Sequence, residues 1–371
     1  MNKSWIILVA VTLIFSGIYL YLDRKPRSPA TSPASRIAES SPRKQSVVAE
    51  NLDTPWEIVF LPDKSMLVTE RKGTVRYIDP SGQLSSQPIL EITDAREIGE
   101  GGLMGMALHP DFEKNGYVYL YYTYSGDENG TKNRVVRMTY DNTALSDEET
   151  IIDNIPGAQN HNGGRIAFGP DGYLYITTGD AQNPSLAQNT DSLAGKILRV
   201  TETGAPAPGN PFENLVYSYG HRNPQGLAWD ARGQLWSTEH GRSGIQSGFD
   251  EVNLIRAGGN YGWPDIQGTE TRGEMIAPVI NSGSSDTWAP AGAAIVQDTL
   301  YFVGLRGRSL YEVSIQGESL GELSQLLNDE YGRLRVAALG PDNYLYIATS
   351  NKDGRGNPGE TDDRIIKIPL K

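Results

Sequence analysis

The chain has 371 residues, with 33 Lys and Arg against 45 Asp and Glu, a formal net charge of −12, and no cysteine. The first 46 residues hold seven basic and two acidic side chains, so residues 47–371 carry a net charge of −17. Such an acidic domain is a poor partner for nucleic acid or an anionic membrane, and the lack of cysteine excludes disulfides, zinc–thiolate sites and thiol chemistry.

The N-terminus predicts export. Residues 4–22 are uncharged and apolar, follow Lys3, and as a helix would reach about 28 Å, close to the hydrocarbon thickness of a bilayer. No small-residue cleavage site follows directly, which favours an uncleaved anchor, while the basic residues at 24–27 argue against export. We expect residues 1–23 to be a signal peptide or membrane anchor that tethers a periplasmic or otherwise extracytoplasmic protein. Residues 24–46, rich in Pro and Ser, predict a disordered linker before a domain at 47–371.

A hairpin pattern recurs along residues 47–371: a β-rich run, a turn with Pro-Asp or Asp, and a second β-rich run. Six turns mark the repeats, at Pro62, Pro110, Pro170, Asp230, Asp298 and Pro341. Repeats of four strands at roughly 40–50 residues are typical of propeller blades. The pattern predicts an all-β fold, a six-bladed β-propeller; a β-sandwich or two β-domains is the alternative.

The loop Asn160-His161-Asn162-Gly163-Gly164-Arg165 leads into one of these hairpins, and the loop at 220–226 leads into the next. In a propeller such loops converge on one end of the central channel, so we expect 99–105, 160–165 and 220–226 to face one another. His161 is then a candidate base near neutral pH. His240 would either line the same end or pack there, and His109 is expected to be a turn residue.

Arginines lead into or follow the same strands, at Arg222, Arg306, Arg333 and Arg335. Together they predict a bound anion with several oxygens, unless they pair with surface carboxylates. Arg222 and Asn223 would stabilise negative charge on an oxygen. The segment 250–264 is either a Ca²⁺ loop or a tight turn with Trp263 over the core.

Seven motifs in this order resemble the soluble PQQ-dependent glucose/sorbosone dehydrogenase family, including the aldose sugar dehydrogenases, over roughly 47–371. The matching segments are Gly99-Glu100-Gly101-Gly102-Leu103-Met104-Gly105, Asn160-His161-Asn162-Gly163-Gly164-Arg165, Gly220-His221-Arg222-Asn223-Pro224-Gln225-Gly226, Glu239-His240-Gly241, Asp250-Glu251-Val252-Asn253-Leu254, Gly259-Asn260-Tyr261-Gly262-Trp263-Pro264 and Gly332-Arg333-Leu334-Arg335. The resemblance implies a six-bladed propeller that holds pyrroloquinoline quinone (PQQ) and Ca²⁺ and oxidises aldoses to lactones, with an external electron acceptor.

The resemblance also implies roles for individual residues. His161 would take the proton of the anomeric hydroxyl, and Arg222 would act beside it in catalysis. Cofactor contacts would come from Glu100, Arg222, Asn223, Thr287, Arg306, Arg333 and Arg335. The carbonyls of Gly241 and Arg242 would hold the catalytic Ca²⁺, Glu251 and the carbonyl of Tyr261 a structural one, and Trp288 would contact the sugar.

Two of the departures from the family pattern concern the cofactor and the base. Glu100 stands where the family has Gln, and a carboxylate beside an anionic quinone is repulsive unless it is protonated or metal-bound. Asn160 stands where the glucose enzyme has Asp, so the carboxylate that would orient His161 is expected to be missing. These departures favour one alternative, a non-catalytic glycan- or protein-binding propeller. Another alternative is a Ca²⁺-dependent lactonase.

Overall fold

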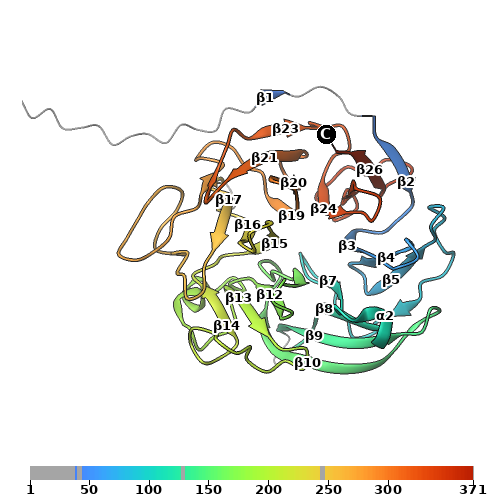
Figure 1. Cartoon of the computed structure of the whole chain (residues 1–371), viewed down its shortest axis with the longest axis horizontal. Helices are drawn as coiled ribbons and strands as arrows, with labels where there is room; N and C mark the ends of the chain where they lie inside the picture. Colours follow the sequence, from blue (N-terminus) through green and yellow to red (C-terminus); the bar gives the residue numbers. More distant parts are fainter. Residues whose placement is uncertain (1–37, 40–43, 127–129, 243–246, 371) are drawn as a thin grey trace, which may run out of the picture. The chain divides into compact units, whose positions relative to one another are not determined.

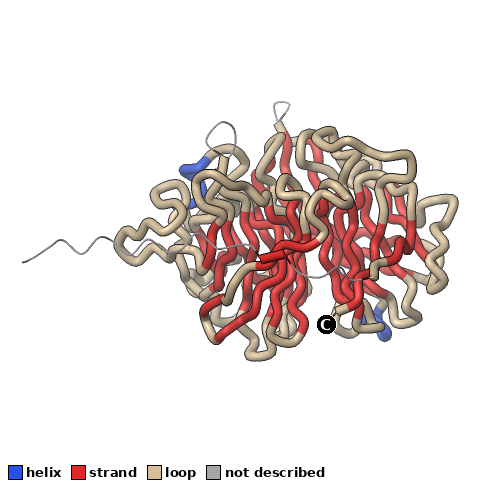
Figure 2. Tube along the Cα trace, turned by 90° about the horizontal axis from the view of Figure 1, so that it is seen from above, coloured by secondary structure: helices blue, strands red, loops and turns tan. Residues whose placement is uncertain are grey.

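The repeated hairpins form the inner strands of six antiparallel sheets arranged around a central channel (Figure 1). The computed structural model describes residues 38–39, 44–126, 130–242 and 247–370, all within the compact unit Ser35–Lys371. Viewed from the side, the strands run between two layers of loops (Figure 2). Each sheet is built on four antiparallel strands, and the predicted six-bladed propeller is confirmed.

The blades follow the chain in order, and the first strand of each lies next to the channel. Blade 1 consists of β3 (Pro55–Phe60), β4 (Met66–Glu70), β5 (Thr74–Ile78) and β6 (Leu90–Glu91). Blade 2 consists of β7 (Leu103–Leu108), β8 (Tyr117–Ser125), β9 (Thr131–Tyr140) and β10 (Leu145–Gly157). Blade 3 consists of β11 (Ile166–Phe168), β12 (Leu174–Thr178), β13 (Lys196–Val200) and β14 (Val216–Tyr219). Blades 4 and 5 consist of β15 (Pro224–Trp229), β16 (Leu235–Glu239), β17 (Glu251–Ile255) and β18 (Ile280–Asn281); and β19 (Pro290–Val296), β20 (Thr299–Gly304), β21 (Leu310–Gln316) and β23 (Ser324–Leu326), with β22 (Ser319–Leu320) and β1 (Ala38–Glu39) at its outer part.

The last blade closes the ring with a strand from the beginning of the chain. Blade 6 consists of β24 (Leu334–Leu339), β25 (Tyr344–Thr349), β26 (Ile365–Pro369) and β2 (Ser46–Ala49), which pairs antiparallel with β26. The inner strand β24 of this blade contacts β3 of blade 1. Because the first and last blades are joined in this way, no gap remains in the ring.

All six predicted turn markers lie between the first and second strands of their blades. The turn positions that need a left-handed backbone are occupied by residues that tolerate it, such as Gly172 with φ 79° and Asn343 with φ 62°. Helix is confined, among the described residues, to α2 (Phe112–Asn115) and a 3-10 turn at Pro184–Gln188.

The core consists of one apolar cluster at each interface between neighbouring blades. Between blades 4 and 5, for example, Trp236 and Trp288 pack with Phe302, all less than 2 % exposed. Six such interfaces hold the blades at fixed positions, so the loops at the channel end have a rigid base.

The predicted anchor or signal peptide at 1–23 lies outside the described residues, as does most of the predicted linker at 24–46. Within that linker, β1 pairs parallel with β23. Among the described residues, no helix has the length and apolar character that crossing a bilayer requires.

Candidate active site

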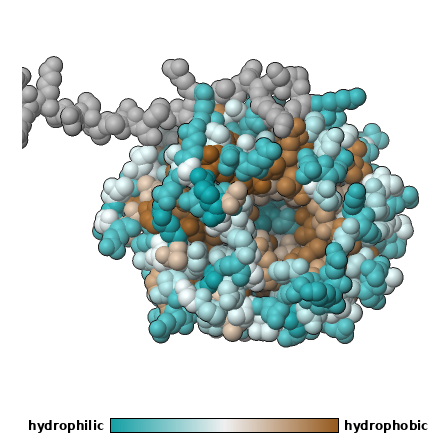
Figure 3. Space-filling model, in the orientation of Figure 1, coloured by the Kyte–Doolittle hydropathy of each residue, from teal (hydrophilic) through white to brown (hydrophobic). Residues whose placement is uncertain are grey.

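Loops of blades 2 to 6 meet at one end of the channel and enclose a cavity of about 450 Å³. Figure 3 draws the face of the ring seen in Figure 1 and shows that this face is hollowed near its middle. Some of its residues lead into the first strand of a blade, and others connect the second strand to the third. The described lining residues are Glu100, Asn160, His161, Gln182, Arg222, His240, Gly241, Arg242, Asp250, Thr287, Ala289, Leu305, Arg306, Arg333 and Arg355.

His161 enters this cavity from the loop before β11. Its backbone is left-handed, with φ 64°, and its N–H donates to Glu100 Oε2 at 3.1 Å. The ring Nδ1 lies 2.8 Å from Asp180 Oδ1, whereas Nε2 has no hydrogen-bond partner among the described residues. A carboxylate accepts, so Nδ1 carries the proton and Nε2 presents a lone pair. His161 is therefore set up as a base.

Asp180 corrects the expectation that no carboxylate orients the histidine. It follows β12, is fully buried, and its Oδ2 accepts a hydrogen bond from Trp263 Nε1 at 2.8 Å. One oxygen of Asp180 is thus hydrogen-bonded to the His161 imidazole and the other to the Trp263 indole. The orienting carboxylate comes from the loop after the second strand of the same blade, rather than from the residue before His161.

Glu100 is ion-paired, an arrangement that the sequence analysis did not foresee. Arg355 donates from Nη1 to Glu100 Oε1 at 2.7 Å and from Nη2 to Asn160 Oδ1 at 2.6 Å. Burial alone would raise the pKa of Glu100, but His240, Arg355 and the His161 N–H lower it to about 2. The carboxylate is therefore ionised at neutral pH and has a cation beside it.

The cavity carries a strong positive charge although the domain as a whole is acidic. Five arginines and two carboxylates line it among the described residues. Arg333 is fixed by Asp353, with Nε and Nη2 2.8 and 2.6 Å from Oδ2, and Arg306 has no ion-pair partner in the described part of the chain. Burial lowers the pKa of Arg222, against the nearby carboxylates that raise it. This lining suits an anion with several oxygens.

Asp250 joins two of the predicted site segments. Its Oδ1 accepts the N–H of Gly241 at 2.8 Å, and its Oδ2 accepts the Thr287 hydroxyl at 2.9 Å and the N–H groups of Trp288 and Ala289. Gly241, Arg242 and Thr287 consequently lie on one wall of the cavity. Sequence analysis placed Asp250 only within the segment 250–264, as part of either a Ca²⁺ loop or a tight turn.

Three of the residues predicted to contact the cofactor or the sugar do not line the cavity. Asn223 is fully buried behind it, where Oδ1 accepts the Gly163 N–H at 2.9 Å and Nδ2 lies 3.5 Å from Glu100. Arg335 is buried deeper, with Nη1 2.6 Å from Gln225 Oε1, and burial lowers its pKa to about 9. Trp288 is 1 % exposed in the core between blades 4 and 5, because the chain turns its ring away from the cavity that Thr287 and Ala289 line.

A second, much smaller cavity of about 20 Å³ lies beside Gly241 and Arg242. The predicted calcium residues Glu251 and Tyr261 line it, together with Glu239 and Gln267. Burial, and then Glu239, raise the pKa of Glu251 well above its ordinary value. Gln267 Oε1 is buried with no partner in the described part of the chain. These oxygens are the ligand type that Ca²⁺ prefers.

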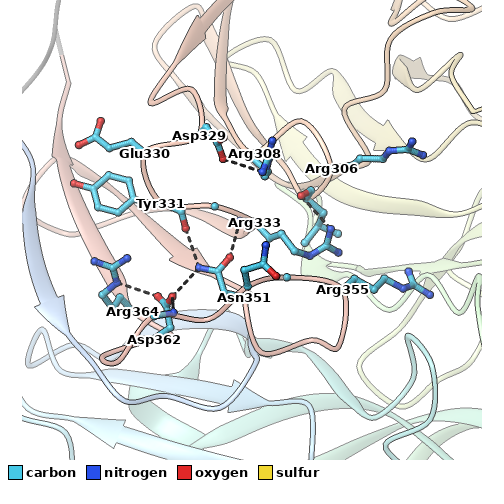
Figure 4. A pocket seen from close by; sticks show the side chains of 15 residues that line it. Arg306, Arg308, Asp329, Glu330, Tyr331, Arg333, Asn351, Arg355, Asp362 and Arg364 are labelled. Atoms are coloured by element: carbon cyan, nitrogen blue, oxygen red, sulfur yellow. Dashed lines mark hydrogen bonds and ion pairs between the residues drawn. The ribbon is translucent and has the colours of Figure 1, made fainter.

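A third cavity of about 630 Å³ adjoins the first and shares Leu305, Arg306, Arg333 and Arg355 with it. Figure 4 shows Arg306 and Arg355 extending to the same side, away from Asp362 and Arg364. The other arginines of this cavity are paired locally, Arg308 with Asp329 at 3.1 Å and Arg364 with Asp362 at 3.0 Å.

Asp180, Asp250 and Arg355 are the site residues that sequence reasoning missed. A positional signal exists for Asp180 and Asp250, since Asp180 lies two residues after β12 and Asp250 directly before β17, both at the end of the ring where His161 lies. Arg355 has a weaker signal, because it lies six residues after β25 in a Gly-rich loop.

Comparisons with known proteins agree with this geometry. Residues 52–359 match the sequence model of the Glucose / Sorbosone dehydrogenase family. Aldose sugar dehydrogenase YliI of Escherichia coli (strain K12) is 33% identical over 341 residues, which cover 83% of this chain and 90% of that protein. Quinoprotein glucose dehydrogenase B of Acinetobacter calcoaceticus is 32% identical over 301 residues, 72% of this chain and 62% of that one.

A solved structure agrees as well. The PQQ-bound form of aldose sugar dehydrogenase from Streptomyces coelicolor is 39% identical and superimposes with a TM-score of 0.82, covering 90% of this chain and 100% of that one. The family match spans most of the propeller, including every loop around the cavity. The predicted oxidoreductase class is confirmed, and the chain belongs to the glucose/sorbosone dehydrogenase family.

Proposed function

We propose that this protein oxidises aldose sugars, or related sugar hydroxyls, to lactones with PQQ and Ca²⁺, and passes the electrons to an external acceptor. The observation that carries the proposal is an oriented imidazole, His161, facing a cavity with five arginines and two carboxylates. The relatives named as sugar dehydrogenases support the substrate class.

The residues of the cavity fit PQQ. The cofactor is a planar tricarboxylate quinone, and a cavity of about 450 Å³ lies within the usual range for small-molecule sites. Arg306 and Arg333 would bind its carboxylates, and Arg222 would donate to its quinone oxygens. Asn223 and Arg335 lie behind the described lining, so we expect them to support this wall or to reach the cofactor from beneath.

The chemistry that PQQ supplies when bound is acceptance of a hydride equivalent from the anomeric carbon of the sugar. The proton of the anomeric hydroxyl would go to His161 Nε2, a transfer typically worth about 10²- to 10⁴-fold in rate. Asp180 would then stabilise the imidazolium through the hydrogen bond at Nδ1. Arg222, which lies 5.3 Å from the centre of the Trp263 ring, would offer positive charge to the oxygen that becomes negative.

Oxygen ligands for Ca²⁺ are available at two places. The carbonyls of Gly241 and Arg242 would hold a catalytic ion at the cavity wall, where it would act as a Lewis acid on the quinone. Glu251 and the Tyr261 carbonyl, with the unpartnered Gln267 Oε1, would hold a structural ion in the small cavity.

The two features that favoured a non-catalytic propeller have local explanations. Glu100 is neutralised by Arg355, and His161 is oriented by Asp180 in place of a carboxylate at position 160. Export, and tethering of the propeller through residues 4–22, remain part of the proposal.

The test is a titration of the purified apo-protein with PQQ and CaCl₂, followed by absorption spectroscopy and by dye reduction with several aldoses. We expect a spectrum of bound PQQ and activity that His161→Ala abolishes while PQQ is still bound. Absence of both a cofactor spectrum and dye reduction would contradict the proposal, and hydrolysis of a lactone without PQQ would favour a lactonase.

A further inference from the structure

Arg355 joins loops of three blades at the cavity. It lies in the loop between β25 and β26 of blade 6, whereas its acceptors Glu100 and Asn160 precede the first strands of blades 2 and 3. Its side chain is half exposed, and Glu100 is 13 % exposed. The guanidinium of Arg355 in blade 6 therefore links the loops that lead into blades 2 and 3, through one hydrogen bond to a carboxylate and one to an amide oxygen.

Both acceptors of Arg355 act on the backbone of His161. Asn160 is the residue before it, and the second oxygen of Glu100 accepts the His161 N–H. His161 has a left-handed backbone, which a non-glycine residue keeps only when its surroundings hold it there. The carbonyl of His161 is held as well, because it accepts the N–H of Ala181 at 3.2 Å.

Arg355 is itself held in place. Its N–H donates to Asp353 Oδ1 at 2.9 Å, and the other oxygen of that carboxylate fixes Arg333. The network therefore runs from Arg333 through Asp353 and Arg355 to Glu100 and the backbone of His161. Removal of the Arg355 guanidinium breaks this network at its middle and leaves both of its ends in place.

We infer that Arg355 is a positioning residue for the reaction: by holding Glu100 and Asn160 together, it fixes the backbone of His161 and the direction of its imidazole. The inference rests on the proposed function, because that function assigns His161 as the base. We call the contacts of Arg355 with Glu100 and Asn160 the clamp. A misplacement of 1 Å at a reacting group costs about 100-fold in rate, so loss of the clamp has a measurable effect on turnover.

The test compares Arg355→Met with Arg355→Lys and with Arg308→Met as the matched control. Arg308 is also half exposed and paired with a carboxylate, but it has no contact with the loop at 160. Hydrogen exchange of the backbone at 158–165 is measured in apo-protein, and kcat, KM and the affinity for PQQ are measured in the loaded enzyme.

We expect Arg355→Met to speed exchange of the His161 segment by about 10-fold and to lower kcat by about 10- to 100-fold. KM should change by less than about 3-fold, because Arg355 contacts no sugar in this scheme, whereas the Kd for PQQ should rise because Glu100 loses the cation that neutralises it. Arg355→Lys should recover part of both losses, because an ammonium can reach one acceptor at a time. Arg308→Met should behave as the wild type.

Two results would overturn the inference: wild-type exchange together with wild-type kcat in Arg355→Met, or a kcat that returns to the wild-type value once the variant is saturated with PQQ. If the wild type oxidises no aldose, the proposed function fails by itself. The exchange measurement then decides on the clamp, because it needs neither cofactor nor substrate.

Discussion

The properties of His161 come from contacts that cross between loops and blades. Asp180 sets which ring nitrogen carries the proton, and Glu100 holds the backbone N–H. The sequence neighbours of the histidine supply neither contact. At the residue scale, the candidate base is therefore made by the assembled ring, and Asp180 sets the direction of its imidazole.

Asp180→Asn should lower kcat/KM by about 100-fold or more, because an amide that donates to Nδ1 would leave the proton on Nε2, where the lone pair is needed. Trp263→Phe is the control, since it removes the other hydrogen bond of Asp180 without changing the carboxylate. Steady-state kinetics over a range of aldose concentrations, and PQQ binding by absorption, give the comparison. Equal activity of Asp180→Asn and the wild type would show that His161 is oriented by something else.

At the element scale, the register of β16 with β17 places two buried carboxylates side by side. Glu239 is the direct partner of Glu251 across these antiparallel strands. Glu239 has hydrogen bonds from His221 Nδ1 at 2.8 Å and from the N–H of Arg222, whereas Glu251 is bonded to Asn253 Nδ2 at 3.0 Å. Like charges directly opposite one another destabilise a sheet, so this register favours a cation between them.

The register leads to a pH-dependent effect of calcium. Because burial and Glu239 raise the pKa of Glu251, the folded state favours the protonated form. The apo-protein should then lose stability as the pH rises above about 4.5, the ordinary value for Glu, since the unfolded chain releases this proton more readily. Bound Ca²⁺ removes that cost, so its stabilising effect should be larger at pH 8 than at pH 5, reaching about 3 kcal/mol at 100 times its Kd.

Urea unfolding of apo-protein at pH 5 and pH 8, with and without CaCl₂, checks this expectation. Glu251→Gln should abolish most of the calcium effect at pH 8 and should make the apo-protein more stable there than the wild type. Glu318→Gln, an exposed position in blade 5, should change neither quantity. A calcium effect that is the same at both pH values would exclude Glu251 as the ligand that titrates.

At the scale of the whole molecule, the number of blades was predictable because each turn is local. Pro62, Pro170 and Pro341 lie in the same position of their blades, and four or five residues of sequence are enough to form such a turn. The convergence of the loops was predictable for the same reason, once the repeat count gave a ring. His161, Arg306 and Arg333 accordingly lie where they were expected, around one cavity.

The remaining site residues were not predictable, because they depend on contacts between distant parts of the chain. Arg355 and Glu100 are 255 residues apart, and their ion pair exists only because blade 6 closes beside blade 1. The direction of Trp288 was missed for a different physical reason. Asp250 accepts hydrogen bonds from the Thr287 hydroxyl and from the backbone N–H groups of Trp288 and Ala289. These three bonds set which of the three side chains faces the cavity.

Closure of the ring by β2 gives a prediction for the whole molecule. Deletion of residues 1–43 removes only the short β1 from the described residues, so the free energy of unfolding should stay close to that of the full chain. Deletion of residues 1–50 also removes β2 and leaves β26 as an open edge. Three residues of β26 itself, Ile365, Ile366 and Ile368, are buried in the core. That loss should cost about 3 kcal/mol or more in unfolding free energy and should promote association between copies through the free edge. Urea unfolding and light scattering measure the two effects, and a synthetic peptide of residues 44–52 should restore part of the stability. If the two deletions proved equally stable, the pairing of β2 with β26 would not be what holds the first and last blades together.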